Sequence, residues 1–320
     1  MAVKATAPSP GPRTARAGGP PDGGYGRSLL AQDRRFGYAL IAPVLIALLA
    51  ITAYPLVYNV WNSFHHDNLL IPFEKGFSGL ANYKELFTNN QFLPALVHTV
   101  GFTVVSVAVE TVIGLALAVA LNKRFRGRGI VRAAIFIPWA VPTVVSAELW
   151  KSMFDPQQGF VNYLLSSLHL PLAHTTWLDG TWTAWAAILI ADAWRNTPFI
   201  AIVLLAGLQA IPGDIYEAAR IDGAGAWRTF RKITLPLLKP ALMVALIFRT
   251  LQSFLVFDVV YIMTNGGPGT ATNVLAFLDW KAFLVATDFG YGGAVSVALV
   301  AFALIIAGIY TRVFRVEQTA

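Results

Sequence analysis

The amino-acid sequence predicts an all-α membrane protein with six transmembrane helices. Hydrophobic residues make up 56% of the 320 positions and charged residues only 13%, whereas a soluble protein carries about 25% charge. Six apolar segments are each long enough for the roughly 20 residues that cross a bilayer. Basic residues also alternate between successive loops, as expected for a chain that crosses the membrane several times.

The six apolar segments define the expected spans. They lie near residues 36–61, 95–121, 130–154, 182–209, 237–262 and 292–314. Prolines lie inside the first, third and fourth of these segments, at Pro43, Pro55, Pro138, Pro142 and Pro198. Because proline removes a backbone hydrogen bond, these spans are expected to kink, with the freed carbonyl groups finding partners inside the bundle.

The chain before the first span has a different composition. Residues 1–35 are rich in Gly, Pro, Ala and Arg and hold few large apolar side chains, which predicts a disordered tail. A cleavable signal peptide is not expected, since the first apolar stretch begins only at Phe36. We therefore expect a tail (1–35), a first transmembrane helix with its outer loop (36–94), and a core (95–315).

The basic residues indicate the orientation in the membrane. Most of the 24 lysines and arginines lie in the tail, after the second span, in the 210–240 loop or near the C-terminus. The positive-inside rule places both termini and the 210–240 loop in the cytoplasm. The net charge of +7 then reflects topology and gives no support to nucleic-acid binding, because no soluble basic domain carries it.

Several kinds of chemistry are absent from the sequence. The chain has no cysteine, which excludes disulfides and thiolate metal sites. No Gly-Lys pair exists, so a phosphate-binding loop of the Walker type is excluded. The five histidines are not at metal-ligand spacing, and neither an HExxH nor a GxSxG motif occurs. We expect a non-catalytic subunit that binds no cofactor and no metal.

The stretch from Glu217 to Pro240 is charged yet has a helical pattern between two long apolar runs. Glycines at Gly223 and Gly225 interrupt the pattern, which predicts two short helices with a bend. Such a stretch is either a surface helix or a docking element for a cytoplasmic partner. The apolar face consists of Ile221, Ala224, Trp227, Phe230 and Ile233.

Ionisable residues inside the apolar segments mark a second candidate site. They are Glu110, Glu148, Asp192, Arg195, Arg249 and Asp258. Such residues usually face a bundle interior or a water-filled path, and with aromatic neighbours they suit a neutral, hydroxyl-rich solute. Two alternatives remain: Asp192 and Arg195 could simply pair with each other, and most tryptophans could form an interfacial belt. The candidate path comprises Trp139, Glu148, Asp192, Arg195, Asn196, Arg249, Gln252, Asp258 and Tyr261.

The charged stretch resembles the signature of permease subunits of binding-protein-dependent ABC importers. That signature reads EAA, three residues, Gly, nine residues, Ile, one residue, Leu-Pro, and every position matches here: Glu217, Ala218, Ala219, Gly223, Ile233, Leu235 and Pro236. Three further stretches are similar to the carbohydrate branch of the family. They are FSGLANYKELF at 77–87, LLAGLQAIPGDIYEAARIDGAGAWRTF at 204–230 and FDVVYIMTNGGPG at 257–269.

The resemblance implies a type-1 ABC importer permease fold and a loop that couples to an ATPase. It assigns this coupling to Glu217, Ala218, Ala219, Arg220, Asp222, Gly223, Ala224, Trp227 and Phe230. The implied partners are a second homologous permease, a dimer of ATPase subunits that bind ATP and Mg, an extracytoplasmic sugar-binding lipoprotein and membrane lipid.

The expected function is translocation of a sugar, such as the disaccharide trehalose, across the cytoplasmic membrane. One alternative is an ion-gradient-driven secondary transporter that uses Glu110, Glu148 and Asp192 as a relay, although the sequence shows no clear internal repeat of the kind such folds carry. The other is an ABC permease for glycerol phosphate or another solute.

Overall fold

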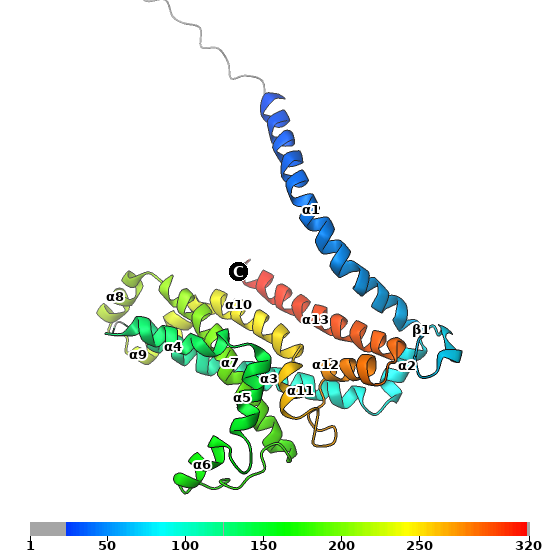
Figure 1. Ribbon diagram of the computed structural model, residues 1–320. Helices are drawn as coiled ribbons and strands as arrows, with labels where there is room; N and C mark the ends of the chain where they lie inside the picture. Colours follow the sequence, from blue (N-terminus) through cyan, green and yellow to red (C-terminus); the bar gives the residue numbers. More distant parts are fainter. Residues whose placement is uncertain (1–23, 124, 319–320) are drawn as a thin grey trace, which may run out of the picture. The chain divides into compact units, whose positions relative to one another are not determined.

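A computed structural model describes residues 24–123 and 125–318. The chain divides into two units, Met1–Val57 and Tyr58–Ala320, which are described separately. Helices dominate both units (Figure 1).

The first unit contains most of helix α1 (Gly24–Ser63), which holds Pro43 and Pro55 without a break. Its apolar part, Phe36–Ser63, is long enough to cross a membrane. The helix begins before Phe36, so residues 24–35 are helical and not the disordered segment that their composition predicts. The rest of the predicted tail lies outside the described residues.

The second unit contains four unbroken apolar helices. They are α3 (Phe92–Asn122), α7 (Thr181–Gln209), α10 (Leu235–Phe254) and α13 (Phe289–Gln318). Together with α1, they give five helices in the described residues that are long and apolar enough to span a membrane. A pair of bent helices gives a sixth candidate if the pair is counted as one span, and the described residues then agree with the six predicted spans.

The third predicted span, 130–154, is broken. Helix α4 (Arg128–Ala140) and helix α5 (Thr143–Met153) meet at an angle of 95°. Pro142 has no N–H to donate and disfavours helical geometry in the preceding residue. Val141 accordingly is extended, with φ −73° and ψ 132°. The predicted kink is therefore a sharp break between two helices.

The fifth predicted span, 237–262, has different boundaries. Helix α10 ends at Phe254, and a separate short helix, α11 (Asp258–Met263), follows. Toward the N-terminus, α10 continues without a break from α9 (Ala226–Thr229) through a π-helical segment, η2 (Phe230–Thr234). The apolar pattern alone did not show either boundary.

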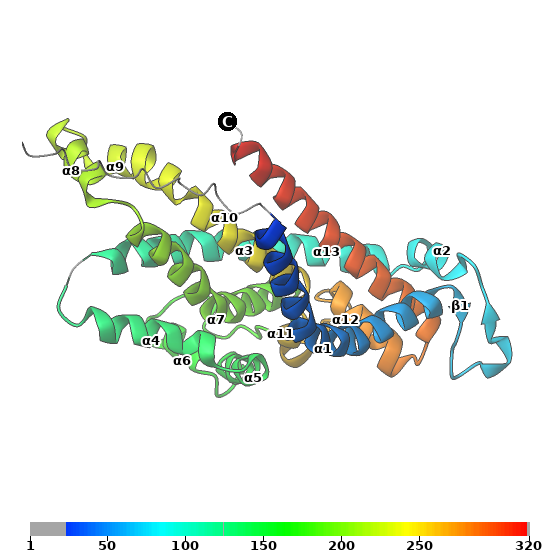
Figure 2. The ribbon, with the colours of Figure 1, turned by 90° about the horizontal axis from the view of Figure 1, so that it is seen from above.

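Close packing joins α3, α7 and α10 at the centre of the second unit (Figure 2). Gly114 of α3 faces Ile200 of α7 so closely that an added Cβ would lie 2.8 Å from the Ile200 Cγ2 atom. Small residues at such positions let helix backbones approach, which is how helices associate in lipid. The shared core consists of Ala118, Leu121, Ile200, Leu204, Leu205, Leu208, Leu238 and Ala245.

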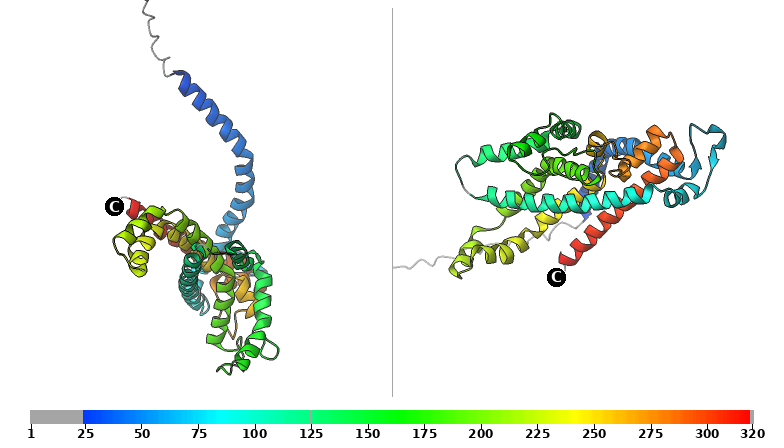
Figure 3. Two further views of the ribbon diagram at one scale, coloured as in Figure 1. Left: turned by 90° about the vertical axis from the view of Figure 1, so that its left-hand side faces the viewer. Right: turned by 90° about the horizontal axis from the view of Figure 1, so that it is seen from below.

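Helix α3 runs from one end of this unit to the other (Figure 3). At one end lie α8 (Gly213–Ile221) and α9. At the other lie α2 (Ala81–Thr88) and an antiparallel hairpin of β1 (His65–His66) and β2 (Gly76–Phe77), with the short 3₁₀ helix η1 (Pro72–Glu74) between the strands.

Shorter elements complete the unit. They are α6 (Phe160–Ser167), α12 (Leu275–Trp280) and the π-helical segment η3 (Lys281–Val285).

Candidate functional site

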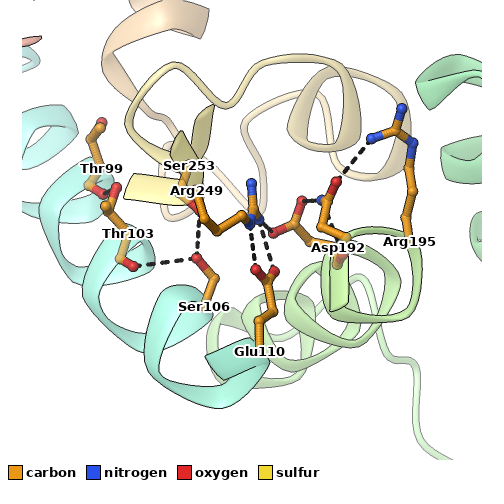
Figure 4. A network of polar contacts seen from close by, with 9 residues as sticks. Thr99, Thr103, Ser106, Glu110, Asp192, Arg195, Arg249 and Ser253 are labelled. Atoms are coloured by element: carbon orange, nitrogen blue, oxygen red, sulfur yellow. Dashed lines mark hydrogen bonds and ion pairs between the residues drawn. The ribbon is translucent and has the colours of Figure 1, made fainter. Parts of the chain in front are cut away.

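A buried ion triad connects three helices of the second unit. Arg249 of α10 lies between Glu110 of α3 and Asp192 of α7 (Figure 4). Its Nε and Nη2 atoms donate to the two Glu110 carboxylate oxygens, the latter at 2.8 Å, and Nη2 also donates to Asp192 Oδ2. The three side chains are 3%, 0% and 9% exposed. Charges so deep require partners, and here the partners come from different helices.

The triad extends toward the break between α4 and α5. Asn196 donates through Nδ2 to Asp192 Oδ1 at 2.8 Å. Arg195 donates through Nη1 to Asn196 Oδ1 at 3.0 Å and through Nε to the Val141 carbonyl at 3.2 Å. A continuous chain of polar contacts therefore leads from α3 to the bend, and Figure 4 shows it as far as Arg195.

A second polar contact ties α3 to α10 one helical turn from the triad. Ser106 and Ser253 are both buried, and their hydroxyl oxygens lie 2.7 Å apart. Because Ser106 precedes Glu110 by four residues and Ser253 follows Arg249 by four, both contacts lie on the same pair of helix faces. The register of α3 against α10 is thus fixed by two polar contacts.

A cavity of about 510 Å³ lies beside this network, between the α4–α5 break and the α10–α11 break. Its volume falls within the range of about 300–1,000 Å³ that is usual for small-molecule sites. Its wall combines charged, amide and hydroxyl groups with two aromatic rings. The polar and aromatic lining residues are Trp139, Thr143, Ser146, Asp192, Arg195, Asn196, Arg249, Gln252, Phe257 and Asp258.

The charged stretch after α7 bends at a tight turn, as predicted, but only α8 is a short helix, because α9 is the start of the continuous helical stretch that runs into α10. Helix α8 ends in a Schellman motif: the Ala224 N–H donates to the Ala219 carbonyl at 2.9 Å, and the Gly223 N–H donates to the Arg220 carbonyl at 3.1 Å. Gly223 has φ +71°, a left-handed conformation that favours glycine. The left-handed turn therefore explains why the EAA signature has a glycine at this position.

This turn presents an apolar and charged surface. Ile221 is 86% exposed and Trp227 is 72% exposed, although Trp227 also stacks on Phe230 with ring centroids 5.8 Å apart. Glu217, Arg220 and Asp222 are exposed beside them, while Ala219 is buried. Exposed apolar residues bordered by charges are typical of an interaction surface. We call Glu217, Arg220, Ile221, Asp222 and Trp227 the loop surface.

Comparison with known protein families identifies the family of this chain. The family described as "Binding-protein-dependent transport system inner membrane component" matches residues 110–316, which include the triad, the cavity and the loop surface. The chain belongs to this family. It is thus an inner-membrane permease component, and the resemblance that the EAA stretch carries is confirmed.

Three relatives of this permease are similar over most of their length. The trehalose/maltose transport system permease protein MalF of Thermococcus litoralis is 43% identical over 90% of the chain and 96% of its own length. The trehalose transport system permease protein SugA of Mycobacterium tuberculosis is 37% identical, covering 88% and 89%. The sulfoquinovosyl glycerol transport system permease protein SmoG of Agrobacterium fabrum is also 37% identical, covering 89% and 92%.

A solved structure agrees with the predicted fold class. A bacterial ABC transporter involved in the import of the acidic polysaccharide alginate contains a chain that superposes with a TM-score of 0.77 at 23% identity, covering 90% of this permease and 98% of that chain. The permease therefore has the type-1 ABC importer fold, as predicted.

Most of the predicted path residues of the permease share the cavity. Glu148 and Tyr261 do not; they line a separate pocket of about 490 Å³ that also contains Lys151, Thr264 and Asn265. The seven that share the cavity are Trp139, Asp192, Arg195, Asn196, Arg249, Gln252 and Asp258.

Sequence reasoning missed how the charges pair. A pair between Asp192 and Arg195, one turn away, was one of the alternatives that the sequence left open, but the ion pair of Asp192 is with Arg249 of another helix. Glu110 was recognised as an ionisable residue in a span but not as the second partner of Arg249, since 139 positions separate the two. Thr143 and Ser146 were also missed, because nothing in a local pattern shows that they face the cavity.

Proposed function

We propose that this permease subunit carries a neutral sugar, such as the disaccharide trehalose, across the cytoplasmic membrane, driven by ATP hydrolysis on a partner subunit. The observation that carries the proposal is the cavity of about 510 Å³, whose wall offers both polar groups and an aromatic ring. The names of the MalF and SugA relatives point to the same class of solute.

The lining of the cavity suits a hydroxyl-rich solute. Trp139 is 49% exposed and is backed by Phe199, with ring centroids 6.0 Å apart, so one face of its indole is available to cover the apolar face of a sugar ring. Asn196, Gln252 and Asp258 supply amide and carboxylate groups that bond hydroxyls. Arg249 contributes little free charge, because Glu110 and Asp192 both bind its guanidinium.

The loop surface would receive the ATPase. Its exposed charged side chains would form ion pairs with the ATPase. The small side chains of Ala218 and Ala224 would let a groove on the ATPase approach closely. Trp227 stacked on Phe230 would hold the loop against the start of α10, so that the loop and the helix move together. Binding of the loop by an ATPase is thus the proposed point of energy entry.

The proposed assembly has further partners. A second homologous permease would complete the pathway, two ATPase subunits would bind ATP and Mg, and an extracytoplasmic sugar-binding lipoprotein would deliver the solute. Both termini and the 210–240 loop would be cytoplasmic, following the distribution of basic residues. The proposed core extends over 95–315 with the first helix and its outer loop, 36–94, before it.

The proposal is tested by transport in proteoliposomes that hold this permease with its second permease, ATPase and binding protein. A panel of radiolabelled trehalose, maltose and glycerol phosphate is offered with ATP on the ATPase side and ionophores present. ATP-dependent uptake of a neutral disaccharide is expected. Uptake of glycerol phosphate alone would identify an anion permease, and uptake that ionophores abolish would identify a secondary transporter; either result overturns the proposal.

A matched pair of variants tests the cavity. Replacing Trp139 by alanine is expected to lower disaccharide uptake about two- to tenfold, since an aromatic platform of this kind contributes on the order of 0.5–1.5 kcal/mol. Trp182→Ala is the control, because Trp182 is 84% exposed and does not line the cavity. Equal uptake by both variants would contradict a solute path past Trp139.

A further inference from the structure

The bend between α4 and α5 has a specific hydrogen-bond donor. Val141 occupies the break, and the following residue, Pro142, offers no N–H. The Val141 carbonyl accepts a hydrogen bond from Nε of Arg195, a residue of α7, at 3.2 Å. A carbonyl group freed by a proline break within a bundle needs such a partner, and here a charged side chain from another helix provides it.

Arg195 is itself held in place. Its Nη1 atom donates to Asn196 Oδ1 at 3.0 Å, and Asn196 in turn donates to both the carboxylate and the backbone carbonyl of Asp192, at 2.8 and 3.1 Å. Asp192 is anchored by Arg249 in the buried triad. The guanidinium group therefore connects the bend to a rigid network, which is more than a flexible surface arginine could do (Figure 4).

The bend controls two residues of the cavity wall. Trp139 precedes Val141 by two positions and Thr143 follows it by two, and both line the cavity. Trp139, the residue before the last of α4, stacks on Phe199 of α7, whereas Thr143 begins α5. Any change in the angle between α4 and α5 therefore moves the indole ring relative to the polar groups opposite it.

We propose that Arg195 is a positioning residue: it holds the α4–α5 bend and thereby the indole face of Trp139 that the cavity presents to solute. The inference rests on the proposed function in one respect, that the cavity is the solute path. Its mechanical part does not depend on that function. Without the guanidinium group, the Val141 carbonyl loses its donor, the two helices sample a range of angles, and the aromatic platform loses its fixed distance from Asn196.

The mechanical part is tested by distance measurement. Because the chain has no cysteine, spin labels attach only at introduced positions; Ile130→Cys in α4 and Leu149→Cys in α5 are suitable, since both side chains are exposed and neither lines the cavity. Pulsed electron paramagnetic resonance on the assembled transporter is expected to give a narrow distance distribution. Arg195→Gln is expected to shift or at least double the width of that distribution, and Arg195→Lys, which keeps an N–H donor, to restore it in part.

A matched control separates this role from the general loss of an arginine. Arg132 also donates to a backbone carbonyl, from Nη2 to Leu121 at 3.2 Å, but away from the bend and the cavity. Arg132→Gln is expected to leave the distribution unchanged. An unchanged distribution in Arg195→Gln, or an equal change in Arg132→Gln, would overturn the proposal.

Solute binding provides the second readout. The dissociation constant of radiolabelled disaccharide, measured by equilibrium dialysis on the assembled transporter without binding protein, is expected to rise at least about fivefold in Arg195→Gln and less in Arg195→Lys. Pro142→Ala retains every charge but restores an N–H at the break, and it is expected to alter both the distance distribution and the dissociation constant.

The two readouts distinguish the possible failures. A bend that changes without any effect on disaccharide affinity would refute the link between the bend and the indole platform. If the unaltered transporter binds and moves no sugar, the proposed function fails, while the distance measurement still decides whether Arg195 holds the bend.

Discussion

Replacing Arg249 by methionine should be among the most destabilising single changes in this permease. The substitution removes the only positive charge of the triad and leaves the carboxylates of Glu110 and Asp192, 0% and 9% exposed, without a counter-charge. Removing one member of a buried ion pair costs about 3–5 kcal/mol, and here two carboxylates lose their partner at once. We therefore expect at least about 3 kcal/mol, a shift of more than 100-fold in the ratio of folded to unfolded protein.

The structure also predicts an order among variants of the triad. Glu110→Gln leaves Arg249 and Asp192 as a balanced pair and removes charge-assisted hydrogen bonds worth about 1.5–3 kcal/mol. It should therefore be less destabilising than Arg249→Met. A triple variant with Glu110→Gln, Asp192→Asn and Arg249→Met buries no charge, and it should recover much of the lost stability.

An unfolding titration of the purified protein in mixed micelles, followed by circular dichroism, measures this order. Arg228→Met serves as the control, because Arg228 is exposed on α9 and should change stability by less than about 0.5 kcal/mol. The reasoning is refuted if Arg249→Met unfolds like the unaltered protein. It is also refuted if the triple variant is no more stable than Arg249→Met alone.

Three further predictions concern the coupling loop, an acidic group outside the spans and helix packing. Gly223→Ala places a side chain at φ +71°, which costs about 1–2 kcal/mol locally, and it should abolish sugar-stimulated ATP hydrolysis while the protein still inserts. The control is Gly213→Ala, where an added Cβ meets nothing within 4 Å. Normal stimulation in Gly223→Ala would contradict the role of the turn. Burial raises the pKa of Asp279 in α12 to about 6, although a hydrogen bond from Ser296 acts in the opposite direction. The folded state therefore binds the proton more tightly than the unfolded state does. The free energy of unfolding should fall by at most about 3 kcal/mol as the pH rises from 4 to 6. In Asp279→Asn, this fall of the unfolding midpoint between pH 4 and pH 6 should disappear. An unchanged dependence of the midpoint on pH would show that another group titrates. Gly114→Val should force α3 away from Ile200 and lower the free energy of unfolding by about 1–3 kcal/mol. Gly101→Ala on the same helix is the control, because its added Cβ meets nothing within 4 Å, and it should be neutral or slightly stabilising. Equal unfolding midpoints for the two variants would refute the close approach of α3 and α7.

Features that depend on local chemistry could be predicted from the sequence. Apolar length alone gave the six spans, since a bilayer of fixed thickness demands a minimum run of residues. Gly223, placed just after a helical pattern, indicated the end of α8, because only glycine readily takes the left-handed conformation that closes a Schellman motif. Pro138 and Pro142 likewise indicated a kink in the third span, and the break falls at Pro142 while Pro138 lies inside α4.

Features that depend on contacts between distant segments could not be predicted. The α4–α5 break, bent by 95°, is contacted by Arg195, which lies more than 50 positions away and for which the sequence offered only Asp192 as a possible partner. The partner of Arg249 was equally hidden, since helical periodicity shows which residues share a face but not which helix lies opposite. The end of α10 at Phe254 has no proline or glycine to mark it, so its apolar run continued past the true boundary.

The uninterrupted path from α9 through η2 into α10 has a mechanical consequence. Ala226–Phe254 forms 29 consecutive helical residues, a rod about 43 Å long at 1.5 Å per residue. Trp227 lies near one tip and Arg249 about 33 Å along the axis, with no loop between them to absorb movement. If the loop receives a push from an ATPase, as proposed, an axial displacement of this tip would act on the guanidinium group and its ion pairs with Glu110 and Asp192. Two features interrupt the regular α-helical hydrogen bonding of the rod, the wider turn at Phe230–Thr234 and Pro240 inside α10, and under such a push the rod would yield first at these two places.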